Sequence, residues 1–461
     1  MARELKVGFV ALGCAKNLVD SERMLAQLAE GGCLVGADLP QADVIVVNTC
    51  GFLEAAREEA HEAIREAVEL KDSGRCRRVV VAGCLVQRDG ERLLAEVPGV
   101  DALVGAHNRD DLLRAVQGGG TKARKSGPAP DLFLGRYHPQ SWSDRARLRL
   151  TPRHYAYVRI NEGCDQKCTF CTIPSIRGPM HSKSPEEIVA EARELIADGA
   201  VELNLIGQDT TSYGKDIGYE PGLAGLLREL NELEGVSWLR LLYAYPSVFK
   251  DEMIAAISEC EKVVKYVDVP LQHVNDRVLR AMGRGITRVQ TEALLDRLRE
   301  RVPGIALRTT LIAGFPGETE AEFAELMEFV REQRFEALGV FAYSHEPETP
   351  AGRMDDQLDR QVKAARVEAL MRAQWTICLE RNRERVGTSF DVLVESETPD
   401  EEGYVAGRAV FQAPQVDSVT RLQRQRGLRA GQIVPARCTG WQEYDLLARP
   451  ASVMLPVVDE S

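Results

Sequence analysis

Three cysteines within eight residues, Cys164, Cys168 and Cys171, constrain this chain more than any other feature. Soft thiolate ligands select iron–sulfur clusters or zinc over hard cations. Structural zinc sites and electron-transfer ferredoxins normally use four protein ligands, whereas this loop supplies three. The spacing therefore predicts a four-iron cluster with one iron left open. The alternative, three cysteines that are merely buried, is disfavoured because Asp, Gln and Lys make this loop polar.

A second set of cysteines, Cys14, Cys50 and Cys84, is scattered along the chain, but each member directly follows a short β-branched run. The carboxyl ends of parallel strands meet at one edge of a sheet, so we expect these three thiols to lie together and bind a second cluster. Ordinary core cysteines at strand ends are the alternative. The remaining cysteines lack such placement and are expected to be structural: Cys33, Cys76, Cys260, Cys378 and Cys438.

Composition indicates a globular protein of several domains. The chain has 461 residues, of which 44% are apolar and 28% charged. A net charge of −12 argues against affinity that rests on unspecific phosphate contacts. No apolar run approaches the length of a membrane span, and the N-terminal run is too short for a signal peptide. Eleven cysteines without an export signal indicate a reducing cytoplasm and metal ligands, not disulfides.

The pattern divides the chain into four parts. Over residues 1–117, four short strand-like runs alternate with amphipathic stretches, which predicts a parallel sheet with helices on both faces. Residues 118–150, opening on three glycines, are expected to form a linker. In 151–382, six strand-like runs separated by helices predict a full or partial βα barrel, with the cysteine loop at its carboxyl edge. Residues 383–455 are expected to form a small β-barrel.

Several motifs together give the chain a close resemblance to the methylthiotransferases, and within them to the RimO family, which modifies an aspartate of ribosomal protein S-twelve. The motifs are Leu12-Gly-Cys14-Ala-Lys-Asn17, Val47-Asn-Thr-Cys50-Gly-Phe52, Gly83-Cys84-Leu85, Glu162-Gly-Cys164 through Ile173-Pro-Ser-Ile-Arg-Gly178, and Gln208-Asp-Thr-Thr-Ser-Tyr-Gly214. The tail resembles a TRAM domain in Gly407-Arg408, Ala413-Pro414-Gln-Val-Asp417 and Glu443-Tyr-Asp-Leu446.

The resemblance implies a flavodoxin-like N-terminal domain, a radical S-adenosylmethionine core and a TRAM barrel. It implies two [4Fe–4S] clusters, on Cys14, Cys50 and Cys84 and on Cys164, Cys168 and Cys171. The core would cleave S-adenosylmethionine to a 5′-deoxyadenosyl radical that takes a hydrogen from the β-carbon of the substrate aspartate, and the N-terminal cluster would deliver a methylated sulfur. Two further residues are candidates for contact with S-adenosylmethionine: Gln208 and Gly314.

The implied partners are ribosomal protein S-twelve, an electron donor and a sulfur donor, with no membrane. Two positions depart from the family pattern, the Ser182-Lys183-Ser184 run and Asp89, and neither is a predicted cluster ligand. His273 follows a predicted strand, where it could face the barrel mouth, although a hydrogen-bonded or solvated histidine without a functional role is the preferred interpretation.

The main alternative function is a transfer-RNA adenosine methylthiotransferase, which would use the same two clusters. From Arg383 to Arg449 the tail has nine Arg, no Lys and ten acidic residues, whereas an RNA-binding barrel should be clearly basic. The alternative for the tail is an RNA-facing patch, although a solvated surface is the preferred interpretation of its four arginines, Arg421, Arg424, Arg426 and Arg429. A non-enzymatic electron carrier is a further alternative, and the predicted open iron in a barrel mouth speaks against it.

Overall fold

The computed structural model describes residues 4–118, 130–135 and 142–451. Its N-terminal part is a six-stranded parallel sheet in the order β2-β1-β3-β4-β5-β6. Its elements are β1 (Lys6–Ala11), α1 (Ala15–Glu30), β2 (Leu34–Val35), β3 (Val44–Thr49), α2 (Glu54–Asp72), β4 (Arg78–Gly83), α3 (Cys84–Asp89), α4 (Arg92–Glu96), β5 (Ala102–Gly105), α5 (Leu112–Gln117) and β6 (Asp131–Phe133).

Helices cover both faces of this sheet because its strands are apolar on both sides. Val44 and Val46 pack with α1 and α5, while Ile45 and Val47 pack with α2 and α4. The four strands expected from the sequence are present at β1, β3, β4 and β5. Strand β6 lies inside the segment expected to be a linker; it pairs with β5 because Phe133 buries its ring against the apolar face of the sheet.

The central part is an open parallel sheet in the order β14-β13-β12-β11-β10-β7, so the barrel is partial. Its elements are β7 (Tyr155–Arg159), β8 (Asn161–Glu162), α6 (Ile173–Arg177), β9 (His181–Ser182), α7 (Pro185–Ala197), β10 (Glu202–Ile206), α8 (Gly222–Asn231), β11 (Trp238–Leu241), α9 (Asp251–Glu259), β12 (Val263–Asp268), α10 (Asp276–Ala281), α11 (Arg288–Arg301), β13 (Ala306–Ala313), α12 (Glu320–Gln333), β14 (Ala337–Ala342) and α13 (Arg360–Arg385).

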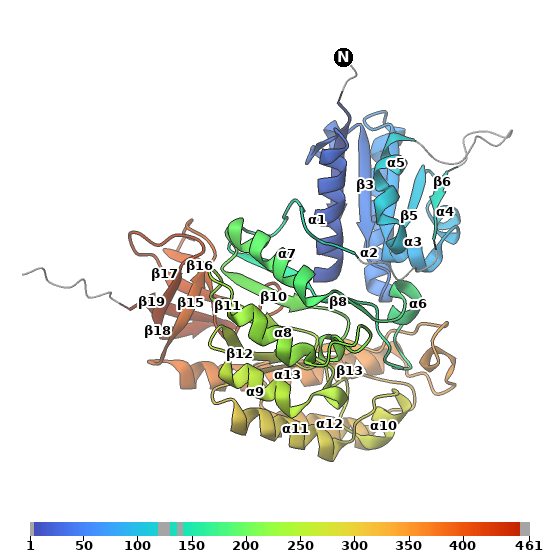
Figure 1. The fold of residues 1–461 in the computed structure, drawn as a ribbon. Coiled ribbons are helices and arrows are strands. Elements are labelled where there is room, and N and C mark those ends of the chain that lie inside the picture. The colour runs from blue at the N-terminus through green and yellow to red at the C-terminus, as the bar shows by residue number, and fades with distance from the viewer. Residues whose placement is uncertain (1–3, 119–129, 136–141, 452–461) are drawn as a thin grey trace, which may run out of the picture.

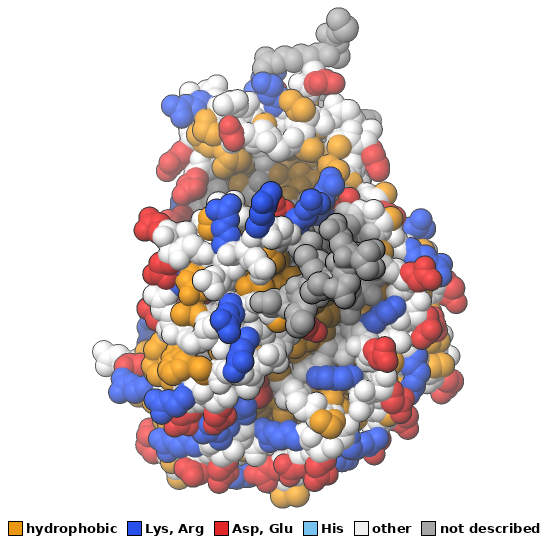
Figure 2. All heavy atoms as spheres, turned by 90° about the vertical axis from the view of Figure 1, so that its left-hand side faces the viewer, with side chains coloured by type: hydrophobic (Ala, Val, Ile, Leu, Met, Phe, Trp, Pro, Cys, Tyr) orange, Lys and Arg blue, Asp and Glu red, His pale blue; other side chains and the backbone are white. Residues whose placement is uncertain are grey.

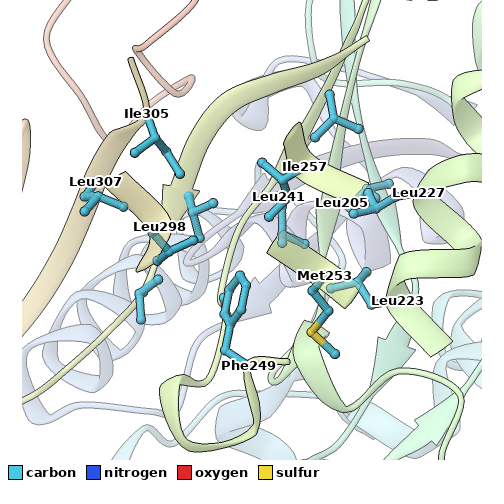
Figure 3. Close-up of a cluster of buried hydrophobic side chains, with 14 of the residues drawn as sticks. Leu205, Leu223, Leu227, Leu241, Phe249, Met253, Ile257, Leu298, Ile305 and Leu307 are labelled. Carbon is cyan, nitrogen blue, oxygen red and sulfur yellow. The ribbon is translucent and has the colours of Figure 1, made fainter. Parts of the chain in front are cut away.

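Alternate residues of the central strands face opposite sides, and the two sides differ in chemistry. The outer side is aliphatic and packs on the surrounding helices, as Leu205 and Leu241 do against Leu227 and Ile257 in Figure 3. The inner side carries aromatic and charged side chains. The sheet is thus held by an aliphatic outer core, and polar chemistry is confined to its concave side.

The C-terminal part is a closed five-stranded barrel, as the sequence predicted. Its strands are β15 (Ser389–Val394), β16 (Tyr404–Ala409), β17 (Thr420–Gln423), β18 (Ile433–Gln442) and β19 (Asp445–Pro450). Glu202 of β10 receives hydrogen bonds from Arg240 of β11 and Arg408 of β16, and all three side chains are buried. This ion triad, beside the apolar residues of both parts, attaches the barrel to the inner side of the central sheet.

The N-terminal sheet stands on the central part, with α6 beneath its lower edge in Figure 1. Two sets of ion pairs join the two parts. Asp20 of α1 binds Arg159 of β7, and Arg57 of α2 binds Glu346 in the loop after β14. These contacts place the carboxyl edge of the N-terminal sheet over the carboxyl edge of β7, where the cysteine loop begins.

Candidate active site

The first cysteine set occupies three neighbouring strand ends. Cys14 follows β1, Cys50 follows β3, and Cys84 is the first residue of α3 directly after β4. Because β1, β3 and β4 are adjacent in the sheet, the three side chains come to one edge, as the sequence predicted. Cys14 raises the pKa of Cys50, and Cys14 and Cys50 both raise the pKa of Cys84, so the three thiols are electrostatic neighbours.

Two glycines allow this close approach. Gly13 has φ of 92°, and a Cβ added to it would lie 2.7 Å from the Cβ of Cys50. A Cβ added to Gly51 would lie 2.9 Å from the backbone carbon of Cys84. Any larger residue at either position would push the cysteine-bearing loops apart.

The three thiols differ in their readiness to ionise. Packing around the sulfur acts to raise the pKa of Cys14, but the Lys16 charge and the N–H of Asn17 outweigh it and lower that pKa. Burial raises the pKa of Cys84 to about 12, against the opposing charge of Arg177. Cys14 is also the exposed member of the set, so it is the most reactive thiol of the three.

The second set lies in the loop between β8 and α6. Burial raises the pKa of Cys164 and of Cys171 to about 12, and Cys168 adds to both shifts. The loop is held at its centre by Thr169, whose N–H and hydroxyl donate to the carbonyls of Met282 and Ala281 after α10. The three thiols are therefore presented on a fixed loop at the mouth of the central sheet.

Arg284 supplies positive charge to this second set. Its guanidinium lies 4.0 Å from the ring centre of Tyr245, and its Nη1 donates to Cys168 Sγ at 3.5 Å. The Tyr245 hydroxyl is 3.7 Å from the same sulfur. Both groups would stabilise a thiolate at Cys168.

Arg177, the last residue of α6, connects the two sets. Its Nε and Nη2 donate to Cys84 Sγ at 3.2 and 2.9 Å, although Cys84 belongs to the N-terminal sheet. Its Nη1 donates to Asp20 and Glu162 at 2.7 and 2.9 Å, and both carboxylates also bind Arg159. One short helix thus begins beside the second cysteine set and ends on the first.

The donor sets fit clusters better than single metal ions. Among the described residues, no three His, Cys, Asp or Glu side chains converge on a position suited to one ion. A mononuclear zinc site needs such convergence, whereas a four-iron cluster takes one thiolate on each of three separate irons. Cationic N–H donors at Cys84 and Cys168 suit the anionic charge of a thiolate-bound cluster.

Gln208 and Gly314 have different surroundings. Gln208 follows β10, and its Nε2 donates to Glu162 at 3.5 Å, while its Oε1 lacks a hydrogen-bond partner within the described part of the chain. Gly314 has φ of 75°, and its N–H donates to Glu318 at 2.8 Å. The positive φ of the turn after β13 is sufficient to explain the glycine at position 314. Contact of Gln208 or Gly314 with S-adenosylmethionine therefore stays a prediction.

His273 does not face the barrel mouth. It is completely buried, its Nδ1 accepts the N–H of Asn275 at 3.0 Å, and burial lowers its pKa to about 3. Lys183, in the run that departs from the family pattern, is also structural, since it is buried against Asp144 and Glu191. These contacts assign both residues to the core.

Sequence reasoning missed the charged side chains that touch the cysteines. Arg177 stands in a motif singled out above, but no role was assigned to it, and Lys16 was likewise only part of a motif. Arg284 is 116 residues from Cys168, and nothing in the local pattern marks it.

The fold and the site define a protein of the radical S-adenosylmethionine class. The sequence pattern of the radical SAM superfamily matches residues 158–330. The uncharacterized protein family UPF0004 matches residues 6–105, and the TRAM domain matches residues 386–450.

Full-length relatives narrow this class to one family. A protein of Anaeromyxobacter sp. (strain K) named "Ribosomal protein uS12 methylthiotransferase RimO" is 47% identical, over 95% of this chain and 92% of the relative. Proteins with the same name from Syntrophotalea carbinolica and Geobacter sulfurreducens are 43% and 42% identical, over 99% and 96% of this chain and 97% and 98% of their own. The chain belongs to the RimO family of radical S-adenosylmethionine methylthiotransferases.

A solved structure shares the fold at much lower identity. The radical S-adenosylmethionine methyltransferase TsrM from Kitasatospora setae, with cobalamin and a [4Fe–4S] cluster bound, superposes with a TM-score of 0.55 at 16% identity. The match covers 93% of this chain and 84% of that one. This similarity supports the arrangement of an α/β domain on a radical SAM core and says nothing about the substrate.

Within the described ranges, no helix has both the length and the apolar character to cross a membrane.

Proposed function

We propose that this chain transfers a methylthio group to the β-carbon of an aspartate in ribosomal protein uS12, using two [4Fe–4S] clusters and S-adenosylmethionine. The main observation is that Arg177, at the end of the helix that follows the second cysteine set, donates to Cys84 of the first set. The chain is also up to 47% identical to proteins named for this reaction. The proposal includes an electron donor, a sulfur donor and a cytoplasmic location, where ribosomal proteins are found.

The chain's own residues divide the work between the two sets. Cys164, Cys168 and Cys171 would hold the core cluster, which when bound supplies the electron that cleaves S-adenosylmethionine, while the N-terminal cluster carries the sulfur to be transferred. Arg284 orients and neutralises Cys168 through its N–H bond. Gln208 lies just after β10, and its side-chain oxygen has no hydrogen-bond partner among the described residues, so it is suited to accept a hydrogen bond from the cofactor.

The first cysteine set is suited to sulfur delivery because one of its members is accessible while another is buried. Cys14 is exposed and Cys50 half-buried, whereas Cys84 is buried and held by Arg177. A cluster bound there would be fixed on the Cys84 side and accessible on the Cys14 side. That accessible side lies toward the mouth of the central sheet, since Lys16, two residues on, reaches Tyr243 after β11.

The C-terminal barrel favours a protein substrate over RNA. Arg421, one of the four arginines considered above for an RNA-facing patch, is paired with Asp400 and Glu402. Arg408 is buried against Glu202 and cannot meet a ligand. Figure 2 shows the face that carries this barrel, with Lys and Arg side chains around its middle and most Asp and Glu side chains toward its edges and base. An acidic enzyme with a near-neutral barrel is suited to a basic ribosomal protein.

The test uses protein reconstituted anaerobically with iron and sulfide. Replacing Cys164, Cys168 and Cys171 by Ala should halve the iron content and abolish cleavage of S-adenosylmethionine. Replacing Cys14, Cys50 and Cys84 by Ala should also halve the iron but keep cleavage and abolish methylthiolation. The matched control replaces three buried cysteines outside both sets by Ala and should keep the full iron content: Cys33, Cys76 and Cys260.

The substrate is tested in the same preparation. Wild-type enzyme is given small ribosomal subunits, free uS12 and unmodified transfer RNA in parallel, and mass spectrometry looks for the added methylthio group. Modification of uS12, free or in the subunit, is the expected result. Modification of transfer RNA alone would replace this proposal with the adenosine methylthiotransferase.

A further inference from the structure

Lys16 is a buried cation without a carboxylate partner. The residue is only 8% exposed, and its ammonium lies 3.3 Å from the ring centre of Tyr243. Within the described residues, no Asp or Glu pairs with it, and its main electrostatic neighbours are Tyr243, Cys14 and Arg177. A buried charge without an ionic partner is costly, so its retention needs an explanation.

The other buried cations of this interface are all neutralised. Arg159 binds Asp20 and Asp144, and Lys183 binds Asp144 and Glu191. Arg147 binds Glu22 and Glu191 in the same way. These three buried cations each have carboxylate partners, whereas Lys16 has none among the described residues.

Lys16 acts on Cys14 through its charge, and within the described contacts its ammonium does not donate a hydrogen bond to that sulfur. Arg177 and Arg284 differ from Lys16 in this respect, because each donates an N–H hydrogen bond directly to a cysteine sulfur. Lys16 is only two residues from Cys14, yet its ammonium lies on a ring that belongs to the central part. The ammonium of Lys16 therefore joins the first cysteine set to the carboxyl edge of the central sheet.

Tyr243 is held rigidly in an unfavourable backbone conformation. Its φ is 59°, which is rare for a residue with a side chain and costs on the order of 1–3 kcal/mol. Its N–H donates to Asp268 at 3.2 Å, and its carbonyl accepts the Thr210 hydroxyl at 3.1 Å. This restraint keeps the ring beneath the ammonium, and backbone strain of this kind gathers at functional sites.

The surroundings of the ammonium leave access for a ligand. Cys14 is exposed, and Tyr243 and Gln208, which follow β11 and β10, are half-buried. If the proposed function is right, the substrate must reach the first cysteine set, and Lys16 lies two residues from Cys14.

We propose that Lys16, seated on Tyr243, binds the carboxylate of the target aspartate and so selects that side chain for methylthiolation. The inference rests on the proposed function and deepens it, because it names the group that distinguishes an aspartate from other substrates. The ligand chemistry is a carboxylate, which S-adenosylmethionine also carries, so the test must separate the two.

The experiment measures equilibrium binding of labelled uS12 to the reconstituted full-length enzyme, without reductant so that no turnover occurs. Wild-type enzyme, Lys16→Met and Lys16→Arg are each titrated with uS12 and with uS12 in which the target aspartate is Asn. We expect Lys16→Met to weaken binding of the aspartate form by about 10- to 100-fold, the range of a hydrogen bond to a charged group, and to leave the asparagine form unchanged. Lys16→Arg should restore most of the preference.

The matched control is Lys262→Met. Lys262 is also a partly buried lysine, but its ammonium donates to the carbonyl of Leu233 at the opposite end of the central strands. This variant should bind both forms of uS12 as wild type does. Thermal unfolding of Lys16→Met and wild type is compared in parallel, and recovery of binding in Lys16→Arg, which keeps the charge, separates loss of the ligand contact from misfolding.

Three results would overturn the inference. If Lys16→Met retains the preference for aspartate, Lys16 does not read the carboxylate. If it weakens S-adenosylmethionine binding in equilibrium dialysis and leaves the aspartate preference intact, its ligand is the cofactor. If it loses iron or changes the cluster's electron paramagnetic resonance spectrum with no change in preference, its role is cluster neutralisation. A wild-type enzyme that does not bind uS12 would instead refute the proposed function itself, and this inference with it.

Discussion

Replacing Arg177 by Met should destabilise the junction between the N-terminal and central parts. The change removes hydrogen bonds to Asp20 and Glu162 and leaves two buried carboxylates with less positive charge. Removing one partner of a buried ion pair costs about 3–5 kcal/mol. Both carboxylates keep Arg159, so we expect the lower end of that range, about 3 kcal/mol.

Urea unfolding of the metal-free protein, followed by circular dichroism, measures this cost. With an m-value of about 3 kcal/mol/M, the midpoint of Arg177→Met should fall by about 1 M. The control is Arg331→Met, because Arg331 forms an exposed pair with Glu328 at 3.6 Å and such pairs contribute little. Equal midpoints for the two variants would refute the reasoning.

The pH dependence gives a second check with a defined sign. Burial acts to raise the pKa of Glu162, but Arg177 and Arg159 outweigh it and lower that pKa in the folded protein. A carboxylate with a lowered pKa contributes stability above its ordinary pKa, and this is lost as pH falls through the folded-state value. Arg177→Met should therefore differ most from wild type near neutral pH, and the difference should shrink in acid. A difference that grows in acid would contradict the assignment.

Two further predictions follow from the same geometry. Glu202→Gln should leave Arg240 and Arg408 buried without their anion and cost about 3–5 kcal/mol, seen as faster tryptic release of the C-terminal barrel than in wild type. Iodoacetamide should label Cys14 of the metal-free protein well before Cys84, and the rate at Cys14 should level off at lower pH than at Cys50, because Lys16 lowers the pKa of Cys14 while burial raises that of Cys50. Mass spectrometry of the alkylated peptides follows the labelling, and similar rates at Cys14 and Cys84 would speak against these surroundings.

The sequence alone was sufficient to predict the order of the three parts of the fold and the grouping of six cysteines into two sets. Strands β1, β3 and β4 could be predicted because buried parallel strands are continuous apolar runs, and a cysteine after each run must reach the carboxyl edge of the sheet. The second set could be predicted because its three members are close in the chain. The closed C-terminal barrel was also visible, although β17 and β19 were not expected individually, since short edge-like strands carry a weak alternating pattern.

Only the tertiary structure decided which charged side chains meet the cysteines. Arg177 is 93 residues from Cys84, and their contact depends on α6 lying beneath the edge of another sheet. Lys16 meets Tyr243 only because the mouths of the two sheets face each other. Sequence periodicity and spacing indicate which face of a helix or strand is buried, and this is a local property. They do not report which two edges will be apposed, because that is set by the packing and charge balance of the whole interface.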